Sequence, residues 1–98
     1  MVGRWCFAAY TKGTAALLAA ILAAAEELDV REALEAQWVL NGFADEAAKR
    51  VQQAMPKAWR FAGEMDEIAA TFRDAGQPAW FHEAAAEIYR RLAQDRPL

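Results

Sequence analysis

The sequence predicts an all-α protein of about five helices, in which shorter helices pack against a long, alanine-rich first helix. Alanine supplies 25 of the 98 residues, and other strong helix formers are common throughout. No segment alternates apolar and polar side chains as a half-buried strand would. The length favours one helical domain over residues 1–98 with one modest core.

The first helix is expected over residues 4–28. Leucine, isoleucine and alanine recur there at the three-and-four spacing of a core-facing stripe. These are Leu17, Leu18, Ile21, Leu22, Ala24, Ala25 and Leu28. The other side carries small residues only, namely Ala9, Gly13, Ala16, Ala20 and Ala23. This small-residue side suits close packing against a second helix or a second subunit.

The second helix is expected over residues 31–40. Asp29 is placed to cap its start, and Gly42 to end it. Asp45 is expected to precede a third, short polar helix that ends near Ala54.

Prolines and a glycine set the limits of the last two helices. Pro56 disfavours a helical residue before it and can occupy the first turn of the fourth helix, which Gly76 ends. Pro78 is expected at the first position of the fifth helix. The predicted apolar faces are Phe61, Met65, Ile68 and Phe72 in the fourth helix, and Phe81, Ala84 or Ala85, Ile88 and Leu92 in the fifth.

Charge and composition exclude several classes of protein. The net charge of −3 argues against binding nucleic acid, which requires a basic surface. The longest apolar run, Ala15–Ala25, has 11 residues, whereas a membrane span needs roughly 20. The single cysteine, Cys6, cannot form an internal disulfide and is expected to be a small buried side chain. We therefore expect a cytoplasmic protein with no membrane partner.

Several catalytic chemistries are also missing from the sequence. The chain has no serine, and its one cysteine has no histidine nearby in sequence, which argues against nucleophilic acyl transfer. One histidine and one cysteine do not make a zinc site. The five glycines form neither a dinucleotide-binding fingerprint nor a P-loop. We therefore expect no metal, and no cofactor bound by this chain alone.

Lys12 is the most distinctive candidate site residue, because it interrupts the apolar first helix. Two interpretations remain open. Its stem can lie along apolar surface while the ammonium reaches water. Alternatively, the charge points into a cleft, where Gly13 allows a ligand or a backbone to approach closely.

Other candidates have a functional and a structural interpretation each. His82 could act as a general base, although packing beside aromatic residues is favoured. Lys57 and Arg60 could hold an anionic ligand, although solvation or an ion pair between Arg60 and Glu64 is favoured.

Acidic and aromatic residues are weighed in the same way. Glu64, Asp66 and Glu67 could be paired carboxylates or metal ligands, but a solvated helix face is favoured because one face rarely supplies convergent ligands. Four tryptophans could line an apolar pocket for a small molecule, but core positions are favoured. They are Trp5, Trp38, Trp59 and Trp80.

Several blocks of residues together resemble a known family. They are Ala-Ala-Tyr-Thr-Lys-Gly-Thr-Ala-Ala-Leu-Leu from residue 8, Pro-Lys-Ala-Trp-Arg-Phe from residue 56, Gly-Glu-Met from residue 63, Glu-Ile-Ala-Ala-Thr-Phe from residue 67, Ala-Gly at 75–76, Pro78, Phe-His at 81–82 and Ala-Ala-Ala-Glu from residue 84. The chain resembles the C-terminal helical domain of phosphogluconate-dehydrogenase-like proteins, the domain of unknown function 1932, in the β-hydroxyacid dehydrogenase superfamily.

The resemblance implies a partner and a cleft. In full-length members an N-terminal Rossmann domain binds NAD(P), and the helical domain supplies the dimer interface and one wall of the substrate cleft. It therefore implies a homodimer and a Rossmann partner, which this sequence lacks. If a Rossmann partner restores catalysis, we expect Lys12, Lys57, Arg60 and His82 to be the substrate-binding residues of the cleft, with the cations holding a carboxylate or phosphate of the substrate.

The chain departs from the catalytic pattern of this superfamily. In that pattern a catalytic lysine near the start of the long helix is followed by an asparagine four positions later and, in the phosphogluconate enzymes, by a glycine nine positions later. Counting from Gly13, these positions hold Arg4 and Ala8. Arginine stays protonated and cannot shuttle a proton as a tuned lysine does. We therefore assign no catalytic residue and expect a module that is not catalytic by itself. The alternative is a freestanding helical protein that forms homodimers or binds a small molecule.

Overall fold

The computed structural model describes residues 2–94, and every regular element in that range is helical. In chain order the elements are α1 (Val2–Glu27), α2 (Arg31–Leu40), α3 (Ala44–Ala54), the short 3-10 turn η1 (Met55–Lys57), α4 (Ala58–Asp74) and α5 (Trp80–Gln94). The predicted all-α class and the long first helix are confirmed.

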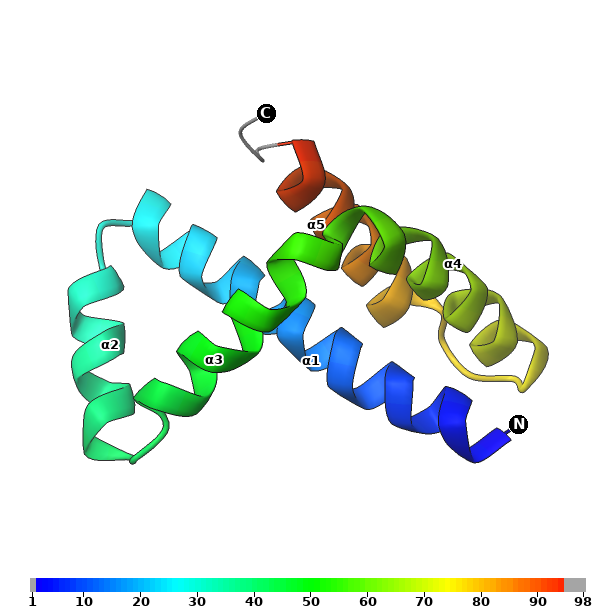
Figure 1. Ribbon diagram of the computed structural model, residues 1–98, viewed down its shortest axis with the longest axis horizontal. Coiled ribbons are helices and arrows are strands. Elements are labelled where there is room, and N and C mark those ends of the chain that lie inside the picture. Colours follow the sequence, from blue (N-terminus) through cyan, green and yellow to red (C-terminus); the bar gives the residue numbers. More distant parts are fainter. Residues whose placement is uncertain (1, 95–98) are drawn as a thin grey trace.

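The helices are arranged around α1, which runs across the whole molecule (Figure 1). The antiparallel pair α4 and α5 packs closely and covers the N-terminal half of α1. At the other end, α2 turns away from α1, and α3 crosses back over it. The helix α1 therefore contacts every other α-helix.

The core lies where α1, α4 and α5 meet. Its two largest fully buried side chains are Tyr89 and Met65. Most of its other members are alanines, with Phe61 and Ile68 beside them. In contrast, α2 has no buried residue. Since an alanine buries little apolar area, this core is thin for a chain of this length.

The side of α1 that faces the core differs from the predicted leucine stripe. Ala16 is fully buried and Gly13 packs against α5, so the small-residue side meets a helix of the same chain. Of the predicted stripe, Leu17 is 56% exposed, Leu28 is 71% exposed and Ala24 is also exposed, whereas Leu18 and Ala25 are buried as predicted. The reason is steric, because α5 brings bulky side chains to the contact and only the small side of α1 leaves room for them.

Three helices end in the same way, with one residue in the left-handed conformation. These residues are Asp29 (φ 60°), Gly42 (φ 71°) and Gly76 (φ 79°). At Asp29 the backbone N–H groups of Asp29 and Val30 donate to Glu26 and Ala25 at 3.1 and 2.8 Å, the paired bonds of a Schellman motif. The two glycine stops were predicted correctly. The predicted cap at Asp29 was wrong, because Asp29 ends α1 and Val30 precedes α2 without a side-chain cap.

Three other boundaries differ slightly from the prediction. The helix α3 begins at Ala44, so Asp45 lies inside its first turn, where its charge favours the helix N-terminus. Pro56 lies in η1, and α4 begins at Ala58 without an intervening loop. The helix α5 begins at Trp80, so Pro78 precedes the helix and does not occupy its first position.

The length and composition of α1 also fit a membrane span, in contrast to the sequence-based expectation. Residues 3–27 form a helix that is long and apolar enough to cross a bilayer. The core helix of a soluble protein can meet the same two criteria. In this fold, α1 carries the lysine Lys12 and contacts all the other α-helices.

The left-handed conformation of Asp29 generates a prediction. We expect Asp29→Gly to raise the free energy of unfolding by about 0.5–1 kcal/mol, because glycine adopts a positive φ without the clash of a Cβ. Urea denaturation followed by circular dichroism measures this change. Asp45→Gly is the matched control and should lower stability, since it places glycine inside α3. An Asp29→Gly protein no more stable than the parent would contradict the prediction.

Candidate functional site

His82 and Gly13 form a close contact between α1 and α5. A Cβ at Gly13 would lie 3.0 Å from His82 Nε2. That nitrogen is 3.0 Å from the carbonyl oxygen of Ala9, so it must carry the proton and donate. His82 is only 8% exposed, its ring lies 4.7 Å from that of Phe72, and its Nδ1 has no hydrogen-bond partner among the described residues. The structure therefore places His82 as a packing residue of the α1–α5 contact.

Tyr89 makes a second hydrogen bond from α5 to α1. Its hydroxyl donates to the carbonyl oxygen of Lys12 at 2.5 Å, and its side chain is fully buried. Burial, with a smaller contribution from the Glu64 charge, raises the pKa of the Tyr89 phenol well above its usual range. The phenol therefore remains a neutral donor and fixes the turn of α1 from which Lys12 extends.

Lys12 reaches across to α4. Its Nζ forms an ion pair and hydrogen bond with Glu64 Oε2 and lies 4.4 Å from the centre of the Phe61 ring. Arg60 Nε lies 3.5 Å from the other oxygen of Glu64, which confirms the predicted Arg60–Glu64 pair. One carboxylate therefore holds two cations, and both lie over one aromatic ring.

The other candidates do not join this cluster. Lys57 is exposed in η1 and forms no ion pair with any described residue. His82 lines a different cavity from Lys12. Arg4, at the position expected for a catalytic lysine, is exposed near the start of α1. Of the four predicted substrate-binding residues, the structure brings only Lys12 and Arg60 together.

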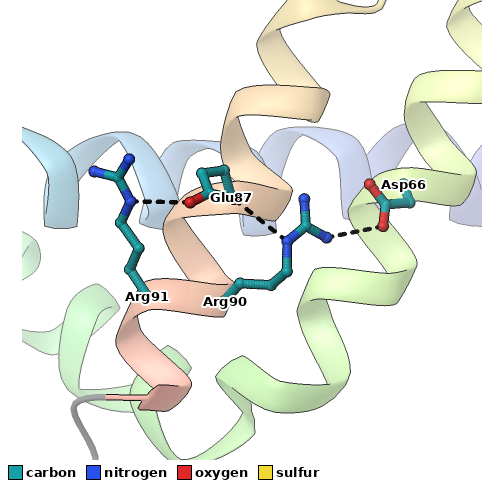
Figure 2. A network of polar contacts seen from close by, with 4 residues as sticks. All are labelled: Asp66, Glu87, Arg90 and Arg91. Atoms are coloured by element: carbon teal, nitrogen blue, oxygen red, sulfur yellow. Dashed lines mark hydrogen bonds and ion pairs between the residues drawn. The ribbon is translucent and has the colours of Figure 1, made fainter.

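Of the three acidic residues considered in α4, Glu64 and Asp66 pair with cations, whereas Glu67 is exposed and forms no ion pair with a described residue. Asp66 Oδ2 accepts a hydrogen bond from Arg90 Nη1 on α5 at 3.0 Å, and Glu87 bridges Arg90 and Arg91 (Figure 2). The hydrogen bond from Arg91, and more weakly that from Arg90, lowers the pKa of Glu87. No three potential metal ligands are grouped anywhere in residues 2–94.

A groove of about 510 Å³ runs between α1 and α5. Small side chains line its floor, and no carboxylate, lysine or arginine borders it. Its rim carries Trp80, which is 75% exposed, and Phe81, which is 77% exposed, so the predicted core position of Phe81 was wrong.

The tryptophans and the cysteine also depart from the predicted core. Trp59 and Trp80 are exposed, whereas Trp5 and Trp38 are half-buried. The four therefore do not gather in one pocket. Cys6 is exposed and is not the buried side chain that we expected.

A second cavity, of about 370 Å³, lies among α1, α3, α4 and α5. Lys12 and Arg50 both line it. Arg50 Nε donates to Glu46 at 2.9 Å, which raises the pKa of Arg50, and its Nη1 donates to Thr14 Oγ1 at 3.2 Å. Sequence analysis did not single out Arg50, because a glutamate four residues earlier is typical of an ordinary solvated pair.

Comparison with protein families gives one match. The family model for the domain of unknown function 1932 (DUF1932) matches residues 25–92. The chain belongs to this family. The DUF1932 match includes Arg60, Glu64 and His82, whereas Lys12 and Gly13 precede the matched range. Searches of curated proteins and of solved structures found no match.

Proposed function

We propose that this DUF1932 chain is the dimerisation and substrate-cleft domain of an NAD(P)-dependent 6-phosphogluconate or β-hydroxyacid dehydrogenase-like protein, and that it is not catalytic alone. The resemblance of the sequence blocks supports the enzyme class. The observation that supports the dimerisation role most strongly is a large exposed apolar face on α1 and α5.

We call this surface the α1/α5 apolar face, and it consists of Phe7, Tyr10, Leu17, Trp80 and Phe81, all more than half exposed. An aromatic side chain can bury about 150–250 Å². Four aromatic residues and a leucine therefore leave several hundred Å² of apolar surface in water, close to the roughly 800 Å² that each partner buries in a standard interface. Monomeric proteins rarely leave a patch of this size uncovered.

A second copy of the chain is the occupant that best fits this face. The face carries both protruding aromatic rings and a groove floored by small residues, so two copies can each place rings in the other's groove. A two-fold interface needs this kind of self-complementary surface. The groove also has no carboxylate, lysine or arginine along it, which suits an apolar partner.

In the proposed cleft, the cations hold the substrate. Lys12 and Arg60 both contact Glu64, so they offer two neighbouring positive charges to a carboxylate or phosphate group. Lys57 and His82 lie apart from this pair and are left out of the proposed cleft. Arg4 supplies a fixed charge and no proton shuttle. The proton transfer of a dehydrogenase therefore has to come from elsewhere in the complete enzyme.

The dinucleotide belongs to a Rossmann partner in this proposal, because the residues of this chain do not fit it. The sequence has no glycine-rich dinucleotide fingerprint. Residues 2–94 contain no strand, hence no strand-to-helix turn that could hold a pyrophosphate.

We also propose a cytoplasmic location, which suits an NAD(P)-dependent assembly.

A second candidate function is a freestanding homodimer or small-molecule-binding protein. The 510 Å³ groove favours it, because that volume lies within the range of ligand pockets, about 300–1,000 Å³. The two candidates share the dimer but differ over the need for a Rossmann domain. Restoration of dehydrogenase activity by an added Rossmann domain would favour the first.

The α1/α5 apolar face predicts the mass of the protein in solution. The parent chain should be a dimer by size-exclusion chromatography with light scattering, and Leu17→Asp should be a monomer because it would bury a charge in the interface. Leu40→Asp is the matched control, since Leu40 is 81% exposed on α2, away from the face, and should leave the dimer intact. A monomeric parent would refute the dimer.

The absence of a dinucleotide fingerprint predicts how the chain responds to NADPH. Titration of the isolated chain into NADPH should leave the nicotinamide fluorescence unchanged, because residues 2–94 contain no strand-to-helix turn that could hold a pyrophosphate. Saturable enhancement with micromolar affinity would show that this chain binds the dinucleotide and would overturn the assignment to a Rossmann partner.

A further inference from the structure

Four helices surround the 370 Å³ cavity, which is separate from the apolar groove. Its polar lining combines Thr11 and Lys12 from α1 with Glu46, Arg50 and Gln53 from α3, and Tyr89 of α5 lies beside Phe61 of α4. Two positive charges from different helices therefore border one small space. A surface ion pair on a single helix would not create such an arrangement.

Both cations have hydrogen-bonding capacity left. The Lys12 ammonium has three N–H groups, and its bond to Glu64 uses one of them. The Arg50 guanidinium has five, and its bonds to Glu46 and Thr14 use two. The cavity is therefore bordered by more donors than its present partners employ.

The existing carboxylates do not prevent an anion from entering. Glu46 is half exposed, so it can turn to water if Arg50 changes partner. Glu64 also contacts Arg60, and it would keep that cation if Lys12 moved toward a ligand. Neither carboxylate would be left buried and unpaired, which is the main cost of breaking such pairs.

Contacts with α4 and α5 also fix the position of Lys12. Tyr89 donates to the carbonyl oxygen of Lys12, and the Phe61 ring lies under the ammonium. Thr14 similarly accepts from Arg50 and orients the guanidinium. Preorganised donors of this kind lose little conformational entropy when a ligand binds.

From this arrangement we infer that the cavity between Lys12 and Arg50 binds a small ligand through an oxyanion group, either a carboxylate or a phosphate. Arg50 would bind two oxygens with its planar fork, and Lys12 would supply the second charge. Thr11 and Gln53 border the remaining space and can bond to polar atoms of the ligand. The cavity volume suits a compact metabolite-sized anion and not a dinucleotide.

This inference shares Lys12 with the proposed substrate cleft, but it adds Arg50 to the ligand site and needs no Rossmann domain. It concerns the chain alone. An anion could bind here even if the dimer or the dehydrogenase assignment failed, and the mass and NADPH measurements would show those failures separately.

The test is a titration of the ¹⁵N-labelled chain with inorganic phosphate and, separately, with succinate, at constant ionic strength set by sodium chloride. We expect saturable shifts of the Arg50 Nε–H signal and of the Thr11 and Thr14 amides with at least one anion. The anion that saturates identifies the group. Arg50→Gln should raise the dissociation constant at least about tenfold, as expected for losing hydrogen bonds from a charged group.

Two further variants separate binding from general charge or folding effects. Arg91→Gln is the matched control, because Arg91 pairs with a glutamate four residues earlier, as Arg50 does, but lines none of the three cavities described by the structure. It should bind like the parent. Arg50→Lys should recover part of the lost affinity, and circular dichroism would verify that each variant is folded. Linear, unsaturated shifts with both anions, or equal affinity in Arg50→Gln and the parent, would overturn the inference.

Discussion

The missing side chain of Gly13 sets how closely α1 and α5 approach, and the rest of the structure depends on that approach. The His82 ring lies so close to Gly13 that its Nε2 would be only 3.0 Å from a Cβ at this position. At this separation His82 can donate to Ala9, and Tyr89 can donate to Lys12 one turn later. These two bonds fix the rotation of α1, and that rotation decides which side chains face α4, which line the second cavity and which remain in water.

This rotation explains the unusual distribution of large side chains. Because alanine and glycine occupy the inner side of α1, the core receives little apolar area from the longest helix. Leu17 and Tyr10 are left outside, next to Trp80 and Phe81 at the start of α5. The contact that makes the fold compact thus also creates an apolar surface that a partner is proposed to cover. The polar features lie on another side of α1, where Lys12 meets Glu64.

Local features were predictable from the sequence, whereas features that depend on helix rotation were not. Gly42 and Gly76 end their helices as expected because a positive φ is a local requirement, and Arg60 meets Glu64 because both lie one turn apart on one helix. The spacing of residues in α1 allows either the leucine side or the small-residue side to face the core. The bulky residues of α5 determine that the small-residue side does. The proximity of Lys12 and Arg50 likewise arises from tertiary packing of distant segments, which no spacing in the sequence encodes.

The most direct test of this account compares two glycine-to-alanine substitutions by chemical denaturation. Gly63 lies inside α4 with nothing within 4 Å of an added Cβ, so Gly63→Ala should raise the unfolding free energy by up to about 1 kcal/mol. Gly13→Ala has the same propensity gain, but it forces a methyl group against His82, which its hydrogen bond and Phe72 hold in place. We predict a net loss of about 1–2 kcal/mol from this overpacking. If Gly13→Ala stabilised the protein as much as Gly63→Ala, the close contact would not control the packing of α1.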